Sequence, residues 1–531
     1  MPKRKRTSAQ GELSNKPPGS TTLAPELNPV SEQAQVAERP EFDLTSIPRV
    51  TNIVREQNTI RYYPANTVED NELTFIIPKD RYWTNVKGIQ MVMEFAPTAP
   101  NGGNLGDQEG MRGVIATEDI YHTYFDDQLC HAWWSKLKVD LNSINLPDAS
   151  QCYYLKAWMH TFLTTNKETQ ESLGDFTLWE RDIHGVTEVP ATAIQSRDDI
   201  PTGFYHSPSI SSSSDSFQPV FSRSQTQGDN KRRWNYFPYR MKKYEVLTWG
   251  TARTHQQRAV PKHWLFQQSK CLPPMNELKL TFTRANPATY MLHPSATQPQ
   301  DVSMKLKSMW LEVPKFDLEA QYNAALMSVF LRTPMVLPIL GRMDIRRYNL
   351  SKDSTSADQQ NIFSGPVPDQ LVIGFVESSK IAGVLNATFH DFYHYNVKDL
   401  WVERGGKRYP NNTGYTDMGF GDGDPSVNRK ALEAYQDFQT LGLKAQNPYV
   451  IPVTLREWCN ARCTLFYFDI TDADSAGGFA PEAVNPVRAS SVNIHATFSK
   501  ALSTAVDMVV LSISNNVMTL TNLGVPHFNF A

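Results

Sequence analysis

Short runs in which apolar and polar residues alternate dominate the chain from Phe42 onward. Alternation with a period of two places every second side chain on one face of a β-strand, so one face of each run can be buried. Loops rich in Gly, Pro, Asn and Ser separate the runs. The clearest runs are residues 73–78, 89–95, 137–141, 278–282, 304–311, 371–375, 399–402, 464–468, 492–496 and 508–513. Many short strands joined by polar loops predict an all-β protein of sandwich or jelly-roll type.

Apolar residues recur at helical spacing in three places. The three stripes are Tyr154, Leu155, Trp158, Met159 and Phe162; then Leu318, Tyr322, Leu326 and Phe330; and last Ala431, Leu432, Tyr435 and Phe438. Asp317 precedes the second stripe and is a residue type that caps helix N-termini, so we expect a helix to begin there. Since this middle stripe separates two groups of strands, it predicts a helical connector between two similar β domains.

The N-terminal segment has a different composition. Residues 1–39 contain no aromatic residue and no isoleucine, and Pro, Ser, Gln, Glu and Ala dominate. Such a segment cannot offset the entropy of ordering its backbone, so we expect a disordered tail. A compact basic run, of the kind read by nuclear import receptors or placed against nucleic acid, is formed by Lys3, Arg4, Lys5 and Arg6. A merely solubilising tail is the alternative interpretation.

Composition narrows the class of protein. The chain has 531 residues, of which 40% are hydrophobic and 11% aromatic, so it can form two or more domains with substantial cores. A formal net charge of −3 gives no general attraction to nucleic acid or to an anionic membrane. The five cysteines are widely spaced, which does not fit a disulfide-stapled secreted protein. Without a leader or an apolar run of about 18 residues, we expect a chain made in the cytosol with no membrane span.

Two motifs resemble metal sites in part. His390 and His394 are four residues apart, but the Glu of the HExxH motif is absent. Their aromatic surroundings indicate a strand, on which the two histidines would lie about 13 Å apart and could not share an ion. Cys459 and Cys463 have no second cysteine pair and no histidine nearby, so we expect two buried thiols. The sequence predicts no metal and no cofactor.

Two further segments resemble binding sites in part. Residues 419–424 superficially suggest a calcium loop, but their spacing fits a flexible acidic turn better. Residues 231–240 mix Lys and Arg with aromatic residues, a combination that can stack on nucleic acid; Pro238 and the following lysines favour a solvated loop. No phosphate-binding loop and no nucleophile motif occurs, so the sequence predicts no catalytic residue.

Five segments, in this order along the chain, carry a family resemblance. They are LKVDLNSINL at 137–146, YYLKAWMHTFLTTNKETQESL at 153–173, LFQQSKCLPPMNELKLTFTR at 265–284, residues 371–409 with the run HYNVKDLWVERGGKRY at their end, and FDITD at 468–472. The chain thereby resembles the double jelly-roll major capsid, or hexon-like, proteins of Polinton and adintovirus-type elements. The resemblance implies two eight-stranded jelly rolls side by side. It further implies that three chains form a pseudo-hexagonal capsomer of an icosahedral shell around double-stranded DNA.

Pattern and resemblance together give a domain map. We expect a disordered basic tail at 1–45, a first jelly roll with long insertion loops at 46–315, a helical connector at 316–337, a second jelly roll at 338–515 and a C-terminal extension at 516–531.

The resemblance also implies partners and a location. The partners would be further copies of the chain, as a homotrimer and a capsomer lattice, together with penton and minor capsid proteins. Packaged DNA and host nuclear import receptors would contact the basic tail. The location would be the virion, and the host nucleus during assembly. Two alternatives stay open: a single-jelly-roll capsid or penton-like protein with large loops, and a lectin-like or carbohydrate-active β-sandwich.

Overall fold

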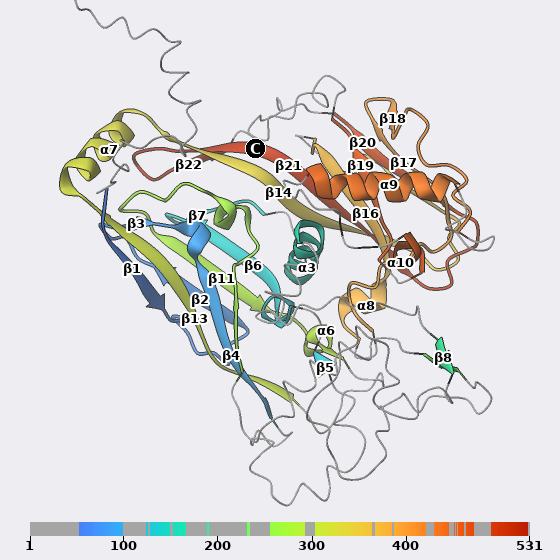
Figure 1. Cartoon of the computed structure of the whole chain (residues 1–531), viewed down its shortest axis with the longest axis horizontal. Coiled ribbons are helices and arrows are strands. Elements are labelled where there is room, and N and C mark those ends of the chain that lie inside the picture. Colours follow the sequence, from blue (N-terminus) through green and yellow to red (C-terminus); the bar gives the residue numbers. More distant parts are fainter. Residues whose placement is uncertain are drawn as a thin grey trace, which may run out of the picture. The chain divides into compact units, whose positions relative to one another are not determined.

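The computed structural model describes residues 53–98, 124–125, 128–148, 152–165, 188–190, 231–233, 255–292, 303–363, 367–384, 387–420, 429–444, 451, 453, 455–460, 463–471 and 490–528. The chain divides into Met1–Asn52 and Ile53–Ala531, and the described residues all belong to the second unit. The predicted tail at 1–45 lies outside the described residues, which begin at Ile53. Figure 1 shows the described strands gathered into two sets of sheets.

The first set of strands forms one jelly roll. One sheet has the order β1 (Val54–Tyr62), β13 (Ser303–Leu318), β4 (Gln90–Thr98) and β10 (His255–Ala259), and β3 (Trp83–Thr84) also pairs with β13. The other sheet has the order β2 (Glu72–Ile77), β11 (Leu278–Arg284), β6 (Trp134–Leu141) and β7 (Ile144–Asn145). If these eight strands are numbered along the chain, the sheets read 1-8-3-6 and 2-7-4-5, which is the arrangement of a jelly roll.

The second set of strands repeats this topology. One sheet has the order β14 (Met335–Leu350), β21 (Val506–Leu520), β16 (Gln370–Glu377) and β19 (Leu465–Asp469), and β22 (Pro526–Phe528) also pairs with β21. The other has the order β15 (Ser356–Gln359), β20 (Val492–Phe498), β17 (Val397–Arg404) and β18 (Lys407–Tyr409). The sheets again read 1-8-3-6 and 2-7-4-5. The all-β prediction with two tandem jelly rolls is therefore confirmed, and the alternative with a single jelly roll is wrong.

The remaining elements are short and mostly connect strands. The helices are η2 (Val86–Gly88), α2 (Leu129–Ala132), α3 (Tyr153–Thr164), η7 (Trp264–Gln267), α6 (Pro287–Tyr290), α7 (Ala320–Arg332), α8 (Ser378–Ala382), α9 (Arg429–Lys444) and α10 (Leu455–Asn460). Two small two-stranded sheets pair β5 (Tyr124–Phe125) with β12 (Met291–Leu292), and β8 (Glu188–Pro190) with β9 (Lys231–Arg233).

Alternation along the sequence fixes the register of the core strands. Three apolar residues of β2 stand opposite three of β11, and all six are buried; the pairs are Leu73 with Phe282, Phe75 with Leu280, and Ile77 with Leu278. A shift of one residue would turn every one of these side chains away from the core. Each of the ten runs that the alternation singles out falls on a strand of this kind.

Two long strands have no clear alternation and are not among the predicted runs. β1 has the sequence VREQNTIRY and is exposed at most positions, so it presents no apolar face. β14 contains Pro338 and Gly341, and its register with β21 shifts between Ile339 and Arg342. The predicted connector at 316–337 is shorter in the structure, where α7 lies between the end of β13 and the start of β14.

Two of the predicted helical stripes lie on buried helix faces, and only one of their residues, Leu432, is exposed. The five residues of the first stripe lie in α3 and are all buried. In α9, Ala431 and Phe438 are buried and Tyr435 is half-buried. Leu432 is 43% exposed, so its assignment to the stripe is wrong, and Ala434 occupies the buried position instead.

The middle stripe is wrong in two respects. Asp317 lies in β13, where it pairs with Glu56 of β1, and the residue at the N-cap of α7 is Glu319. Strand pairing continues to Leu318 and so delays the start of the helix. In addition, no residue of α7 is fully buried, although Phe330 is partly buried against the core.

The predicted boundary at residue 515 differs from the structure. β21 continues to Leu520, and the chain then turns so that β22 pairs with it. The turn is closed by a hydrogen bond from the N–H of Thr521 to the carbonyl oxygen of Val525, and Gly524 supplies its positive φ of 73°. Residues 516–528 thus extend a sheet of the second jelly roll.

Truncation of Phe375 tests the core of the second jelly roll. Its buried ring packs edge-on against Phe466 and Phe498, with ring centroids 6.4 and 5.6 Å away, so Phe375→Ala should lower the free energy of unfolding by about 3–5 kcal/mol. Val54→Ala, at an exposed position of β1, should change it by less than about 0.5 kcal/mol. Chemical denaturation of both variants checks this, and equal losses would contradict the assigned core.

Candidate functional site: the seam between the two jelly rolls

The two jelly rolls share one continuous apolar core. We define the seam as the residues through which they meet. From the first jelly roll it comprises α3, the preceding loop at 147–148 and the segment 261–268; from the second it comprises β14, α8 and the segment 389–392. Figure 1 shows α3 between the strands of the first jelly roll and β14 of the second.

Aromatic rings of α3 form the apolar part of the seam. The indole ring of Trp158 stacks with His390, with centroids 4.6 Å apart and planes 8° from parallel. The same indole stacks with Phe162 at 4.7 Å, which continues the row along α3. Tyr154 packs edge-on against Phe389 at 4.9 Å. Because stacked rings have a preferred separation and angle, these contacts fix α3 laterally against the second jelly roll.

Hydrogen bonds add direction to this packing. The buried hydroxyl of Tyr154 donates to the carbonyl oxygen of Ile381 in α8, 2.7 Å away. Arg347 of β14 donates to Sγ of Cys152, 3.4 Å away, and forms an ion pair with Asp507 of β21. Burial opposes ionisation of Asp507, but hydrogen bonds from Ser378, Arg347 and Asn349 hold its pKa below the ordinary value. A charged group of the second jelly roll is thereby anchored beside the N-terminus of α3.

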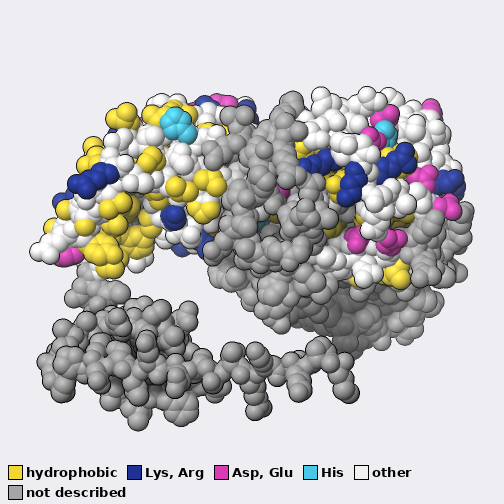
Figure 2. Space-filling view, turned by 90° about the horizontal axis from the view of Figure 1, so that it is seen from above, with side chains coloured by type: hydrophobic (Ala, Val, Ile, Leu, Met, Phe, Trp, Pro, Cys, Tyr) yellow, Lys and Arg dark blue, Asp and Glu magenta, His cyan; other side chains and the backbone are white. Residues whose placement is uncertain are grey.

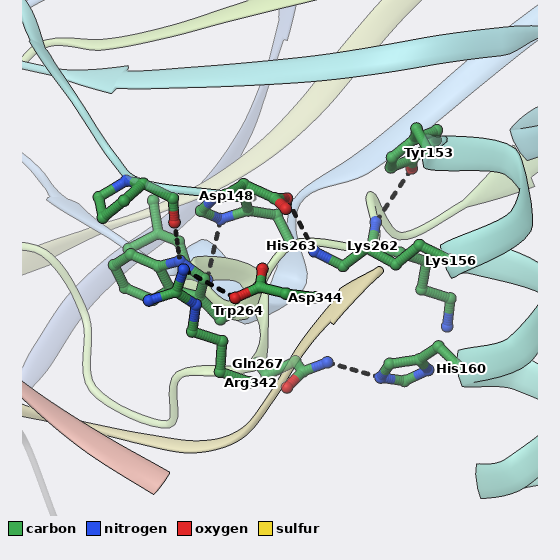
Figure 3. A network of polar contacts seen from close by, with 12 residues as sticks. Asp148, Tyr153, Lys156, His160, Lys262, His263, Trp264, Gln267, Arg342 and Asp344 are labelled. Carbon is green, nitrogen blue, oxygen red and sulfur yellow. Dashed lines mark hydrogen bonds and ion pairs between the residues drawn. The ribbon is translucent and has the colours of Figure 1, made fainter. Parts of the chain in front are cut away.

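A cluster of four charged side chains lies in the polar part of the seam (Figure 3). Nζ of Lys156 lies 2.7 Å from Oδ2 of Asp148 in the first jelly roll, and Nη2 of Arg342 lies 2.8 Å from Oδ2 of Asp344 in the second. Burial raises the pKa of Asp344, and the neighbouring Asp148 raises it further, while Arg342 and Lys156 lower it. Each jelly roll therefore contributes one acid and one base to the same buried cluster.

Two histidines beside this cluster are held neutral. The hydroxyl of Tyr153 accepts a hydrogen bond from the backbone N–H of Lys262 and forms a second hydrogen bond, of 3.0 Å, with Nδ1 of His131. Nδ1 of His263 accepts from the backbone N–H of Leu265 at 3.2 Å. Burial lowers the pKa of His263 to about 3 and holds the pKa of His131 well below its ordinary value. A proton on either ring would remove an acceptor that the local fold uses.

The C-terminal strand closes the seam from another side. The ring of Phe528 in β22 packs edge-on against Trp264 of η7, with centroids 6.2 Å apart. Nδ2 of Asn142, in the turn before β7, donates to the carbonyl oxygen of Gly524 at 2.8 Å. The turn at 521–525 is therefore tied to the first jelly roll although it belongs to the second.

The residues of the seam position the two jelly rolls relative to each other. Buried ion pairs regain only part of their desolvation cost, so the Lys156, Asp148, Arg342 and Asp344 cluster adds little net stability. Each ion pair forms within one jelly roll, and the two pairs lie close enough for Asp148 and Lys156 of the first to shift the pKa of Asp344 in the second. The seam can therefore hold the two jelly rolls in register as one rigid pair.

The structure separates the two predicted histidines. The segment 387–396 forms turns with two isolated bridges, Ala387 with Val384 and Phe392 with Cys463, so the prediction of a strand there is wrong. His390 stacks on Trp158, whereas His394 stacks on Phe420 at 4.6 Å. The turns let the rings of His390 and His394 pack into different surroundings. Cys459 is buried as predicted, and Cys463 is half-buried.

The other predicted segments fall largely outside the described residues. Lys3, Arg4, Lys5 and Arg6 lie outside them, as do residues 421–424 of the acidic turn. Of the segment 231–240, only β9 (Lys231–Arg233) is described. Among the residues that the structure describes, no group of three or more His, Cys, Asp or Glu side chains could hold a metal ion. No helix in the described ranges is long and apolar enough to cross a membrane.

Sequence reasoning missed the charged cluster of the seam. Asp148 and Asp344 are almost two hundred positions apart, and neither lies in a recognisable motif. One signal was present: Lys156 falls within the apolar stripe of α3, where a buried lysine needs an acidic partner. The identity of that partner depends on the fold and could not be read from the sequence.

Comparison with solved structures finds the same architecture elsewhere. A chain in the cryo-EM structure of the Sputnik virophage matches with a TM-score of 0.52 and 11% identity, covering 93% of this chain and 92% of that one. The mavirus major capsid protein matches with a TM-score of 0.45 and 10% identity, covering 97% of each chain. The Faustovirus major capsid protein matches with a TM-score of 0.45 and 9% identity, covering 90% of this chain and 93% of that one.

At this level of identity the likeness to the Sputnik chain shows a shared fold. No protein-family model matches the sequence, and no curated protein matches it either.

Acidification should weaken the fold near the seam. A histidine whose folded pKa lies below its unfolded value of about 6.5 favours the folded state fully above that pH, and the benefit is lost as the pH falls toward the folded pKa. For His263 the loss between pH 7.5 and pH 5 should be about 2 kcal/mol of unfolding free energy. His263→Asn keeps an acceptor for Leu265 and should reduce this pH dependence in urea titrations, and an unchanged slope would refute the assignment.

Proposed function

We propose that this chain is a major capsid protein. The observation that carries the proposal is the repetition of one jelly-roll topology twice in a single chain, with the two copies joined by a buried seam. A shell subunit needs this kind of body, because two similar barrels held rigidly side by side fill two neighbouring positions of a lattice. The fold shared with a chain of the Sputnik virophage over most of both chains supports the same conclusion.

The proposed working unit is a homotrimer. Three chains with two barrels each place six similar barrels around a threefold axis, which makes a pseudo-hexagonal capsomer. Closed symmetric assembly also covers strand edges that a lone chain leaves open, such as the exposed edge strand β1. These capsomers would tile an icosahedral virion shell around double-stranded DNA and meet penton and minor capsid proteins at its special positions.

The proposed family is that of Polinton and adintovirus-type capsid proteins. Its support is the order of similar segments along the sequence. Two of them, at 153–173 and 265–284, begin in the α3 and η7 elements that build the seam. We propose a structural role without catalysis, and its support is that the charged side chains of the described cluster at the seam are paired with one another. A carbohydrate-active sandwich is the runner-up, and hydrolysis of glycans by the purified chain would favour it.

For the N-terminal tail we propose nuclear import in the host through Lys3, Arg4, Lys5 and Arg6, and contact with packaged DNA. Four neutralised phosphates give a modest, salt-sensitive contact for each chain. Repetition over a shell multiplies that contact. The support is the composition of the basic run alone.

Analytical ultracentrifugation of the purified full-length chain tests the capsomer. The expected species has three times the chain mass of 60.2 kDa and persists on dilution, because closed symmetric contacts are made together. A strictly monomeric chain across protein concentrations and salt concentrations would contradict the proposal.

Alanine at positions 3–6 tests nuclear import. The quadruple variant in the full-length chain should lose nuclear accumulation in host cells, since the receptor recognises the clustered positive charge. Arg39→Ala, a cation of the same segment outside the run, serves as the control and should accumulate normally. Equal nuclear fractions for the quadruple variant and the unmodified chain would exclude this role.

A further inference from the structure

One lysine of the second jelly roll lies within ion-pair distance of two carboxylates. Nζ of Lys380 in α8 is 2.5 Å from Oδ2 of Asp391 and 3.7 Å from Oε2 of Glu377. Only 1% of the Asp391 side chain and 14% of the Lys380 side chain are exposed. An amine held against one buried carboxyl group, with a second carboxylate within reach, has the reactants and the proton carrier that formation of an amide bond needs.

Burial distinguishes this group from the charges at the surface. On the face shown in Figure 2, many Lys, Arg, Asp and Glu side chains lie at the surface. Water keeps such groups ionised and mobile, so their ion pairs form and break without reacting. Asp391 stands instead between His390 and Phe392 in the chain, and all three are buried. Because an apolar site disfavours charge, it favours a neutral amine beside a neutral acid, which is the reactive state.

The reacting groups are held in place before any reaction. The hydroxyl of Ser379 donates to Oε1 of Glu377 at 2.9 Å, which leaves Oε2 as the oxygen nearer to the lysine. The backbone N–H of Phe392 donates to the carbonyl oxygen of His390, also at 2.9 Å, and so closes a turn around Asp391. Fixed positions of this kind remove most of the entropic cost of bringing an amine and an acid together.

We propose that Lys380 and Asp391 become joined by an intramolecular isopeptide bond after the chain folds, with Glu377 as the proton carrier. A proton first passes from Nζ of Lys380 to the Asp391 carboxylate. The neutral amine then attacks Cγ of Asp391, and an N–C bond forms. Glu377 takes a proton from the nitrogen and returns it to the leaving hydroxyl group, so one C–O bond breaks and one water departs. The reaction consumes no oxidant, no reductant and no activated co-substrate.

The bond lies at the surface on which α3 packs. Lys380 and Asp391 are 11 positions apart, and the loop between them carries the seam contacts of α8 and of the segment 389–392. Within that loop, the carbonyl oxygen of Ile381 accepts from Tyr154, and the ring of His390 stacks on α3. A covalent link between the two ends therefore holds the surface for α3 in one shape. The bond forms within a single chain and does not depend on the proposed capsid function.

Mass spectrometry of the denatured, trypsin-digested full-length protein tests the bond. Trypsin cleaves after free lysine, so an unlinked chain yields the two peptides 353–380 and 381–398. A linked chain should yield one peptide, 353–398, that is lighter by one water than its sequence, because Lys380 is no longer a substrate and the condensation has released that water. Fragmentation of this peptide should place the link between Lys380 and Asp391.

Two variants and one internal control sharpen the test. Lys380→Arg keeps the positive charge, so it should fold, and it should yield the separate peptides 353–380 and 381–398. Glu377→Gln removes the proton carrier and should form the linked peptide about a hundredfold more slowly. The internal control is Lys138, which lies 3.1 Å from Asp140 but is 48% exposed; trypsin should cleave after it in every sample.

The outcomes are distinct. Full cleavage after Lys380 in the unmodified protein, with both peptides at their sequence masses, would overturn the bond. A blocked site without loss of water would reveal a different modification of Lys380 and would overturn it as well. Equal rates of linkage in Glu377→Gln and in the unmodified chain would overturn the role of Glu377. The capsid function stands or falls separately, on the association of chains.

Discussion

The burial of α3 against the second jelly roll is the contact on which the arrangement of the described chain depends. Each jelly roll buries an inner face between its own two sheets, which any single sandwich does. The additional apolar surface of Trp158, Phe162 and Tyr154 is covered by rings of the second jelly roll, which are His390, Phe438 and Phe389 respectively. If α3 were withdrawn, aromatic rings on both sides would be exposed to water.

Apolar packing and buried charge contribute different properties to this contact. The stacked rings supply most of the favourable free energy, because they remove large apolar areas from water. The ion pairs at Asp148 and Asp344 each form within one jelly roll and contribute little net stability. The register across the seam comes from directional hydrogen bonds, such as those from Tyr154 to Ile381 and from Arg347 to Cys152.

The sequence predicted the fold better than the site, for a physical reason. Alternation is a local property, so runs such as 73–78 and 278–282 reveal strands and their buried faces before any pairing is known. The edge strand β1 could not be predicted in this way, because it is largely exposed to solvent and has no apolar face. The seam could not be predicted from the sequence, because its contacts, such as Tyr154 with Ile381, join residues more than two hundred positions apart. Helix α7 shows the converse case: its apolar residues predict burial, yet the described chain does not bury them.

The central claim is that one chain supplies two equivalent barrels to a ring of six. Negative-stain or cryo-electron microscopy of the purified full-length protein tests it most directly. The account predicts threefold-symmetric particles in which six similar densities surround a common axis. Isolated particles with two barrels and no ring at any protein concentration would contradict it.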